Sequence, residues 1–414
     1  MTLNNGVSSG RSLGSPDAVM FPVQRIVSDV GSSFAVGASA PSTLTNRPTG
    51  AYPENWISFR PFPTDEIPPW EIEELETRQP YKDVDDFHAQ GITGSGVRVM
   101  SLEDYRRSSH AATTTGVIQQ LAPGAEVFQM GYDEIPDTYR LNENNLRNTP
   151  VQEFVRATSS NFYSDAAGAL DRARAEDIQV VTTSAQATHA DYVMYVRDML
   201  GLSGGYGREL MFRGMGISQE AVQREVFGNN PIPTNRREID EKINAYVQRI
   251  HNNDSTIQQA RQTYDQALQT FHDEGGTLFV VAGNEGERVT SAVPDQTGPM
   301  LSNPLAVGVG ATDIHDPDRV ADYSSAGPNV DLTETPALDE GTSFAAPAAA
   351  ATAALMLQRA KDLGYTLEPG ELVQIMTQTT NPLEGDATRT GAGDLNPVAA
   401  MRELERRAGA PPRP

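Results

Sequence analysis

The stretch Gly341-Thr342-Ser343-Phe344-Ala345-Ala346-Pro347 runs directly into an alanine-rich, helix-forming segment, residues 348–359. A serine at such a junction lies where unpaired backbone N–H groups and the positive end of a helix dipole converge. An oxyanion formed beside Ser343 would be stabilised there. Gly341 lets the backbone approach a substrate closely, and Thr342 can cap the turn. An ordinary N-capping serine is the alternative, so a catalytic interpretation requires partners elsewhere in the chain.

From about residue 81 the chain alternates between strand and helix patterns. The predicted strands are Val97–Leu102, Val127–Met130, Ile178–Thr183 and Leu278–Ala282, and the predicted helices include His110–Leu121 and Tyr163–Ala175. The segment 278–282 is wholly apolar, which is typical of a strand buried on both faces. This alternation predicts an α/β fold of three layers, with a mostly parallel central sheet between helices on both faces. Functional groups are then expected at the carboxyl ends of the strands.

The composition narrows the classes of function. A chain of 414 residues that is 38% hydrophobic can form a sizeable core. The net charge of −23 argues against nucleic acid or a membrane as partner, and no run of 18 apolar residues occurs. Cysteine is absent, which excludes disulfides, a thiolate nucleophile and cysteine-bound zinc. The first 20 residues lack the apolar core of a Sec signal peptide, so we expect a cytoplasmic protein or export by another route.

The chain divides into parts by composition and pattern. Residues 1–80 are rich in Ser, Gly, Pro and Asn and are predicted to form an extended arm or pro-segment, able to act as an intramolecular inhibitor. Residues 81–408 are predicted to form the main domain, with a helical insertion at about 187–262, and 409–414 a tail. Asn235 and Glu238 resemble a capping box in the insertion. A core-facing stripe on one helix is predicted from five residues that recur every seven positions: Ile243, Ile250, Ile257, Tyr264 and Phe271.

Acyl transfer by Ser343 needs a base, an acid group that orients the base, and donors for the oxyanion. Asn284 follows the apolar strand directly, in the run Val281-Ala282-Gly283-Asn284-Glu285-Gly286, and is either an oxyanion donor or an ordinary turn residue. Among six histidines, His110 is the candidate base, in the run Ser108-Ser109-His110-Ala111-Ala112-Thr113-Thr114-Thr115-Gly116-Val117. A histidine in a solvated loop is the alternative there.

Together these segments resemble the subtilisin family of serine proteases. The Ser343 stretch is similar to the family's nucleophile motif Gly-Thr-Ser-x-Ala-x-Pro, and the Asn284 run is similar to its oxyanion-hole segment. The His110 run resembles Ser-His-Gly-Thr-His-Val-Ala-Gly-Thr, but departs from it at Ala111 and Thr113. The resemblance spans about residues 85–405. It implies a subtilisin-like fold with Ser343 as nucleophile, His110 as base and Asn284 as oxyanion donor, in the family's order along the chain.

The acid that orients His110 is either Glu103 or Asp104. The segment Gly96–Leu102 is similar to the strand that leads to the catalytic aspartate of subtilisins, and Glu103 comes next. Register favours Glu103, whereas the family's usual chemistry favours Asp104. Successive strand residues face opposite ways, so one of the two points at His110 and the other is a solvated carboxylate. Seven positions separate Glu103 from His110, so the longer loop and helix that subtilisins generally have there should be missing or replaced.

The resemblance also implies how a substrate would bind. Subtilisins add the substrate as a strand along a Ser-x-Gly segment, which corresponds here to Ser184-Ala185-Gln186. Ser184 and Gly283 are therefore candidate substrate contacts, and Gln186 in place of glycine predicts restricted specificity or a closed cleft. No cofactor is indicated. Several family members bind calcium, but the acidic residues between 313 and 322 lack EF-hand spacing and are interpreted as a solvated loop.

The sequence thus predicts a serine endopeptidase that cleaves a polypeptide through an acyl-enzyme intermediate. Access to its cleft would be controlled by the arm, by the inserted helices or by a regulatory protein partner. The alternative is a degenerate relative that keeps the fold for binding or scaffolding. Ala111, Gln186 and the short connection from Glu103 to His110 motivate that alternative.

Overall fold

The computed structural model of the chain describes residues 60–61, 84–103, 109–132, 139–202, 206–337 and 340–410. Of the predicted arm, these ranges include Arg60 and Pro61, and the rest of residues 1–80 lies outside the described residues. Asp104 also lies outside them. The boundaries predicted for the arm, main domain, insertion and tail stay predictions.

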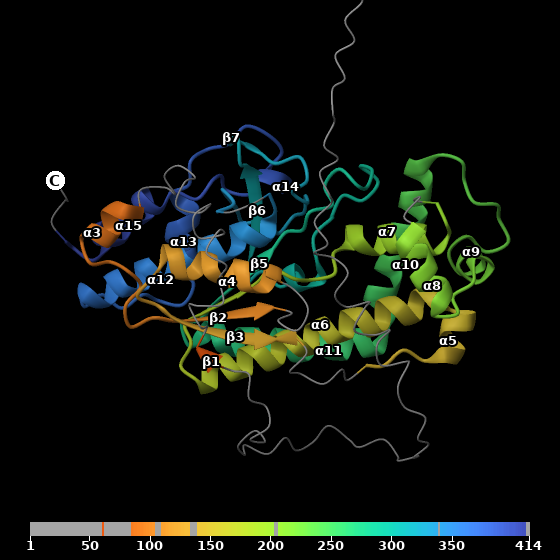
Figure 1. The fold of residues 1–414 in the computed structure, drawn as a ribbon, viewed down its shortest axis with the longest axis horizontal. Coiled ribbons are helices and arrows are strands. Elements are labelled where there is room, and N and C mark those ends of the chain that lie inside the picture. The colour runs from red at the N-terminus through yellow and green to blue at the C-terminus, as the bar shows by residue number, and fades with distance from the viewer. Residues whose placement is uncertain are drawn as a thin grey trace, which may run out of the picture.

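A sheet of eight described strands forms the centre of the fold (Figure 1). Its order is β1-β3-β2-β4-β5-β6-β7, and β8 also pairs with β6. The pairs from β3 through β6 and the β6–β8 pair are parallel, whereas β1–β3 and β6–β7 are antiparallel. The strands are β1 (Arg60–Pro61), β2 (Arg98–Glu103), β3 (Glu126–Gly131), β4 (Val180–Thr183), β5 (Thr277–Val281), β6 (Ala306–Asp313), β7 (Asp316–Val320) and β8 (Leu332–Glu334).

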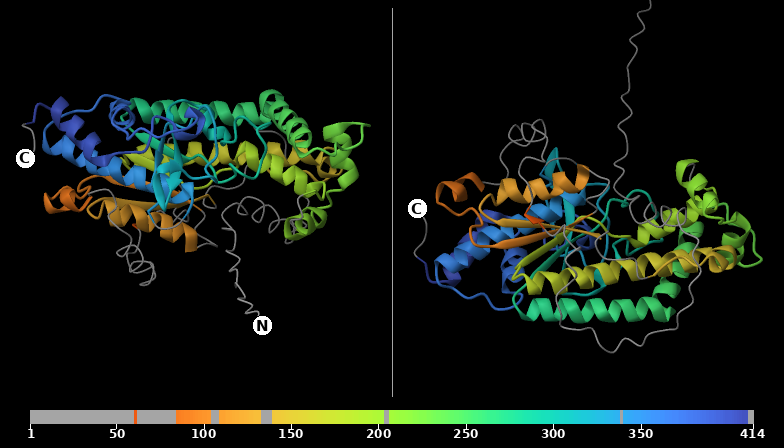
Figure 2. Two further views of the ribbon diagram at one scale, coloured as in Figure 1. Left: turned by 90° about the horizontal axis from the view of Figure 1, so that it is seen from above. Right: turned by 60° about the horizontal axis from the view of Figure 1, so that its bottom comes forward.

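Helices cover both faces of this sheet (Figure 2). One face carries α4 (Ser109–Leu121) and α12 (Thr342–Asp362), and the other carries α6 (Pro150–Ala175) and α11 (Ser255–Asp273). Successive strand residues enter different cores, so Val99 packs on the α12 side and Met100 on the α6 side. Residues 278–281 of β5 are wholly apolar, which fits a strand that is buried on both faces. The predicted three-layer fold is confirmed.

The alanine-rich start of α12 explains how this helix reaches the sheet. Ala345, Ala346 and the run 348–351 are fully buried, and the helix packs against β4, β5 and β6. Small side chains let the helix backbone lie close to the strands, which places its first turn at their carboxyl edge. Around this core lie the shorter elements α3 (Val84–Ala89), η2 (Pro299–Ser302), α13 (Glu371–Gln378), α14 (Ala387–Thr390) and α15 (Pro397–Arg407).

A helical extension occupies the end of the molecule away from α3 and α15 (Figure 1). It comprises α5 (Glu143–Asn148), α7 (His189–Met199), α8 (Tyr206–Gly214), α9 (Gln219–Phe227) and α10 (Arg236–Asn253). These helices share one continuous apolar core with α6 and α11. At its centre the Phe154 ring packs edge-on against Tyr192, Tyr195 and Phe212, with ring centroids 5.6–6.4 Å apart. The extension is therefore an outgrowth of the α6 layer.

Three sequence predictions need correction in this region. The helix predicted to begin at Tyr163 begins at Pro150, a residue suited to a first helical turn, and its additional turns pack on the extension. The stripe predicted for one helix is buried as expected, but it runs over two helices, α10 and α11. Asp254 separates them, because its carboxylate accepts the Thr256 and Ile257 N–H groups and starts a new helix. Asn235 caps α10, but its Oδ1 accepts the Arg237 N–H and not the Glu238 N–H that the predicted capping box would use.

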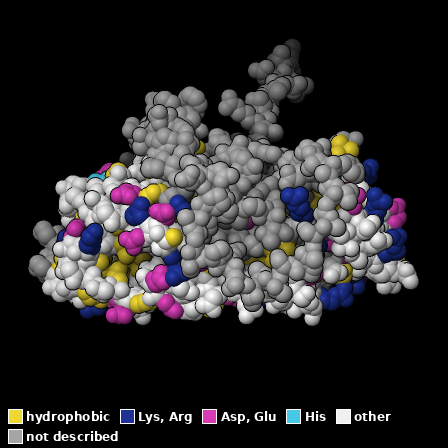
Figure 3. Space-filling view, turned by 90° about the horizontal axis from the view of Figure 1, so that it is seen from below, with side chains coloured by type: hydrophobic (Ala, Val, Ile, Leu, Met, Phe, Trp, Pro, Cys, Tyr) yellow, Lys and Arg dark blue, Asp and Glu magenta, His cyan; other side chains and the backbone are white. Residues whose placement is uncertain are grey.

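Charged side chains are dispersed over the described surface. On the face drawn in Figure 3, acidic and basic groups lie interspersed among uncharged ones. Several form pairs along helices, such as Arg406 with Glu403 at 2.7 Å, and exposed pairs of this kind contribute little to stability. Within the described ranges, no helix combines the length and apolar character needed to cross a membrane.

Candidate active site

Ser343 lies in the first turn of α12 and is almost completely buried, with 3% of its surface exposed. The sequence predicted that Thr342 caps this turn. In the structure the N-cap residue is Gly341, and Thr342 is already the first residue of the helix. Gly341 has φ +146°, a conformation that residues with a Cβ rarely adopt. A Cβ built on it would lie 3.1 Å from Ser343 Oγ. Glycine at this position therefore keeps open the space in front of the serine oxygen.

His110 lies against the serine, as predicted for a base. It is the second residue of α4, and its Nε2 is 3.0 Å from Ser343 Oγ, within hydrogen-bond distance. The imidazole packs against the Phe344 ring at a centroid distance of 5.4 Å, with the rings tilted by 57°. The packing of α4 against α12 thus brings together two residues 233 positions apart. This geometry suits proton transfer from the hydroxyl to the imidazole.

Asn284 lies beside the same space, just after β5. Its Oδ1 accepts two hydrogen bonds from Thr342, one from the backbone N–H at 2.9 Å and one from the hydroxyl at 3.0 Å. These bonds fix the orientation of the amide. The Cβ position of Gly341 lies 3.7 Å from Asn284 Nδ2 and 3.1 Å from Ser343 Oγ. An atom near that point would meet both the nucleophile and an N–H donor, as an oxyanion hole requires.

Glu103 ends β2 at the carboxyl edge of the sheet and is 2% exposed. Its Oε1 accepts the backbone N–H of Ser184 at 2.9 Å. A buried carboxylate at this strand end fits the predicted role of an acid that orients the base. Since Asp104 lies outside the described residues, the choice between the two carboxylates stays open.

The two predicted substrate contacts make internal hydrogen bonds. Ser184 donates its hydroxyl to the Ser343 carbonyl at 2.9 Å and its N–H to Glu103, so it joins the nucleophile segment to β2. This bridging role was missed by sequence reasoning. Gly283, at φ +113°, donates its N–H to the Thr342 hydroxyl at 3.3 Å. Their contact with substrate stays a prediction.

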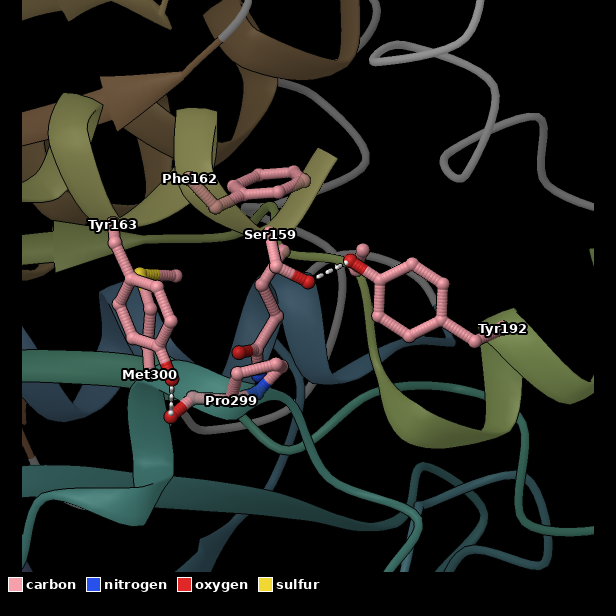
Figure 4. A pocket seen from close by; sticks show the side chains of 8 residues that line it. Ser159, Phe162, Tyr163, Tyr192, Pro299 and Met300 are labelled. Carbon is pink, nitrogen blue, oxygen red and sulfur yellow. Dashed lines mark hydrogen bonds between the residues drawn. The ribbon is translucent and has the colours of Figure 1, made fainter. Parts of the chain in front are cut away.

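Gln186 points into the protein. Its Nε2 donates to the Val281 carbonyl, and its side chain packs so tightly on Gly298 that a Cβ there would overlap Gln186 Oε1. Figure 4 shows the narrow pocket that Gln186 lines, in which the Ser159 and Tyr192 hydroxyls are 2.7 Å apart and Tyr163 donates to the Pro299 carbonyl. Gln186 Oε1 has no hydrogen-bond partner there. The side chain therefore links β5 to the loop after β4.

A pair of buried carboxyls behind Asn284 was not predicted. Asp191, in the first turn of α7, and Glu285, next to Asn284, are each 1% exposed and both approach the Thr188 hydroxyl. Burial raises the pKa of Glu285, and burial together with the Glu285 charge raises the pKa of Asp191 well above its usual range. The pattern Thr188-x-x-Asp191 is a capping-box signal and could have located α7, but nothing in the spacing indicates the contact with Glu285. No cluster of three or more potential metal ligands occurs among the described residues.

A serine oxygen within hydrogen-bond distance of an imidazole, beside an amide donor at the carboxyl edge of a parallel sheet, is the arrangement of a serine hydrolase. The subtilase family model, peptidase S8, matches residues 228–396. The matched segment carries Asn284 and Ser343, and over these residues the predicted resemblance to subtilases is confirmed. Glu103 and His110 lie outside the matched segment.

Proteins that are similar to this chain include several proteases. The extracellular basic protease of Dichelobacter nodosus is 29% identical over 150 residues, which is 31% of this chain and 24% of the relative. The chain therefore spans about a quarter of the length of this relative. Among solved structures, a lanthipeptide protease is similar with TM-score 0.49 and 13% identity, covering 83% of this chain and 99% of its own. The prenylagaramide maturation protease PagA is similar with TM-score 0.46 and 14% identity, covering 78% of this chain and 98% of its own. MycP1 from the ESX-1 type VII secretion system is similar with TM-score 0.44 and 17% identity, covering 78% of this chain and 87% of its own.

Proposed function

We propose that this protein is a serine endopeptidase that hydrolyses a polypeptide through an acyl-enzyme intermediate. The observation that carries the proposal is the 3.0 Å approach of His110 Nε2 to Ser343 Oγ, next to an Asn284 amide held by Thr342. The subtilase match over residues 228–396 supports the same reaction class.

The reaction follows from these positions. Ser343 Oγ attacks the carbonyl carbon of the scissile peptide while His110 Nε2 takes the hydroxyl proton. The resulting oxyanion is stabilised by Asn284 Nδ2 and by the Ser343 backbone N–H at the helix N-terminus. His110 then gives its proton to the departing amine, which leaves an ester on Ser343. Water hydrolyses this ester, with His110 again as base. Glu103 or Asp104 orients the imidazole and stabilises its charged form.

An active-site-directed fluorophosphonate tests the nucleophile. We expect the probe to label the wild-type protein and not Ser343→Ala, with equal thermal midpoints for the two proteins. Glu103→Gln and Asp104→Asn, assayed separately, should differ, with the larger loss of labelling rate at the residue that orients His110. If folded wild-type protein is not labelled, with or without residues 1–80, the degenerate binding protein becomes the better explanation. Equal small losses in both acid variants would contradict an orienting carboxylate at this position.

Control of access is a further part of the proposal. Arg60 and Pro61, from the predicted arm, pair antiparallel with Gln129 and Phe128 at the edge of the sheet. This contact supports an arm that lies on the main domain, and self-inhibition or a regulatory partner would act through it.

The location of the protein, cytoplasmic or exported without a Sec signal, also stays a prediction.

A further inference from the structure

Helix α7 of the extension begins with a reciprocal capping box. Thr188 Oγ1 accepts the Asp191 N–H at 2.9 Å, while Asp191 Oδ2 accepts the Thr188 N–H at 3.0 Å and the Thr188 hydroxyl at 2.9 Å. Thr188 is only two residues beyond Gln186. The start of α7 is thereby fixed immediately after the loop that follows β4.

This capping box also contacts the segment that carries Asn284. The Thr188 hydroxyl lies 3.4 Å from Glu285 Oε2, the same oxygen that accepts the Asn284 N–H at 2.8 Å. A Cβ on Gly283 would come within 2.7 Å of Thr188 Cγ2 and 2.8 Å of Glu285 Oε2. The Thr188 and Glu285 side chains are therefore in close contact with the backbone of Gly283, which precedes Asn284. Any shift of Thr188 would be passed to that backbone.

The charges at this contact make it sensitive to protonation. Asp191 and Glu285 are buried together, and Asp191 Oδ1 has no hydrogen-bond partner. Arg208 from α8 acts on Asp191 and Arg288 acts on Glu285, each favouring the ionised carboxylate. Burial nevertheless raises the pKa of both groups, and the charge on Glu285 raises that of Asp191 further. Ionisation of both carboxyls is therefore disfavoured, because a second negative charge in the same buried site is costly.

We propose that Thr188 and Asp191 are positioning residues for the oxyanion hole, which hold Glu285 and, through it, the backbone of Asn284. The inference rests on the proposed peptidase function. It means that the helical extension sets the position of the Asn284 amide, so the geometry of α7 governs the rate of the chemical step. A correctly placed donor acts mainly in the transition state, and its displacement lowers kcat more than it raises KM.

Substitutions of Thr188 separate its two contacts. Thr188→Val keeps the methyl contact on Gly283 but removes the hydroxyl, and we expect kcat for a peptide substrate to fall at least about tenfold with KM nearly unchanged. Thr188→Ser keeps the hydroxyl and should retain most of the wild-type kcat. Ser218, whose hydroxyl caps α9 in the same extension through the Ala221 N–H, provides the control. Ser218→Ala should lower the thermal midpoint and leave kcat unchanged.

A pH profile tests the carboxyl pair. With rising pH, Asp191 loses its proton and the two carboxylates repel, so we expect the wild-type kcat to fall on the alkaline side. Asp191→Asn cannot ionise at this position, so its kcat should show no such alkaline decline. Identical pH profiles for the two proteins, or an unchanged kcat in Thr188→Val, would overturn the positioning role. If the wild-type protein does not react with the fluorophosphonate, the proposed function itself fails, whereas labelled wild-type protein with unaffected variants rejects this inference alone.

Discussion

At the scale of single residues, the candidate site depends on the absence of a side chain at Gly341, in front of Ser343. Gly341 supplies a positive φ and an absent Cβ in one position, and both are needed where the chain turns into α12. Thr342 orients the Asn284 side chain, since its backbone N–H and its hydroxyl both donate to Asn284 Oδ1. Three consecutive residues therefore have three different tasks: space, orientation of the donor, and nucleophile.

Gly341→Ala should inactivate the protein without unfolding it. The added methyl would lie between Ser343 Oγ and Asn284 Nδ2, and the residue would be strained by about 1–3 kcal/mol at this φ. We expect the fluorophosphonate labelling rate to fall by about 10² or more, the order of magnitude measured in subtilisin for loss of one oxyanion donor.

Gly364→Ala is the matched control for this prediction. Gly364 also has a positive φ, +64°, but no atom lies within 4 Å of the position its Cβ would take. This variant should lose a similar amount of stability in a thermal melt and keep its labelling rate. Equal labelling rates for the two glycine variants would show that the space at Gly341 is not part of the site.

At the scale of elements, the break between α10 and α11 shows how one side chain organises the extension. Asp254 ends α10 and caps α11, so two helices replace the single long helix that the stripe had suggested. The stripe residues remain on the buried face of both helices. The seven-residue repeat predicted correctly which residues are buried, but it contained no information on where the helix axis changes direction.

Asp254→Ala should destabilise the fold by about 1 kcal/mol, since the Thr256 and Ile257 N–H groups lose their acceptor at the helix start. Asp254→Asn keeps an acceptor oxygen and should cost less. Urea unfolding of both variants measures the difference in free energy. A loss that is equal in the two would indicate that the negative charge at the helix N-terminus, and not the hydrogen bond, provides the stabilisation.

At the scale of the whole molecule, a buried histidine pair ties the extension to the rest of the fold. His189 of α7 and His251 of α10 are each 7% exposed, with ring centroids 5.1 Å apart. His251 Nε2 bonds to the Ser159 hydroxyl at 2.8 Å, whereas the Nδ1 atoms of both rings have no hydrogen-bond partner. Asp295, 4.0 Å from His189, faces the pair from a loop, and Arg261 acts on His251 from α11. Two neutral imidazoles are suited to this site, and two charged ones are not.

Stability should therefore fall in mild acid. Burial lowers the pKa of His189, and burial together with His189 and Arg261 lowers the pKa of His251 well below its ordinary value of 6.5. The unfolded chain then binds more protons than the folded chain as pH drops below 6.5, so the stability present above that pH is lost below it. The slope is at most about 1.4 kcal/mol per pH unit for each imidazole.

Thermal midpoints measured from neutral to mildly acidic pH test this prediction. His251→Gln should flatten the pH dependence, and replacement of the exposed His315 by Gln should leave it unchanged. An acid-induced loss of stability that is as steep in His251→Gln as in the wild-type protein would exclude the pair as its cause.

Much of this architecture was predictable from local pattern. The strands leading to Glu103 and Asn284 and the helix carrying His110 were located to within one or two residues, because apolar runs and glycine turns are local signals. The first half of α6 was not predicted, since its packing partners Tyr192, Tyr195 and Phe212 are distant in sequence. The direction of Gln186 was not predictable either, because it depends on space beside Gly298 and on the Val281 carbonyl.

The sequence by itself determined the layered α/β fold and named Ser343, His110 and Asn284 as candidates, because motifs and periodicity record which residue types each position needs. Only the tertiary structure decided that His110 Nε2 lies 3.0 Å from Ser343 Oγ, that Thr342 holds Asn284, and that Asp191 meets Glu285. These contacts join segments separated by 58 to 233 positions. Their distances depend on how α4, α7 and α12 pack on the sheet, and that packing is a property of the whole core.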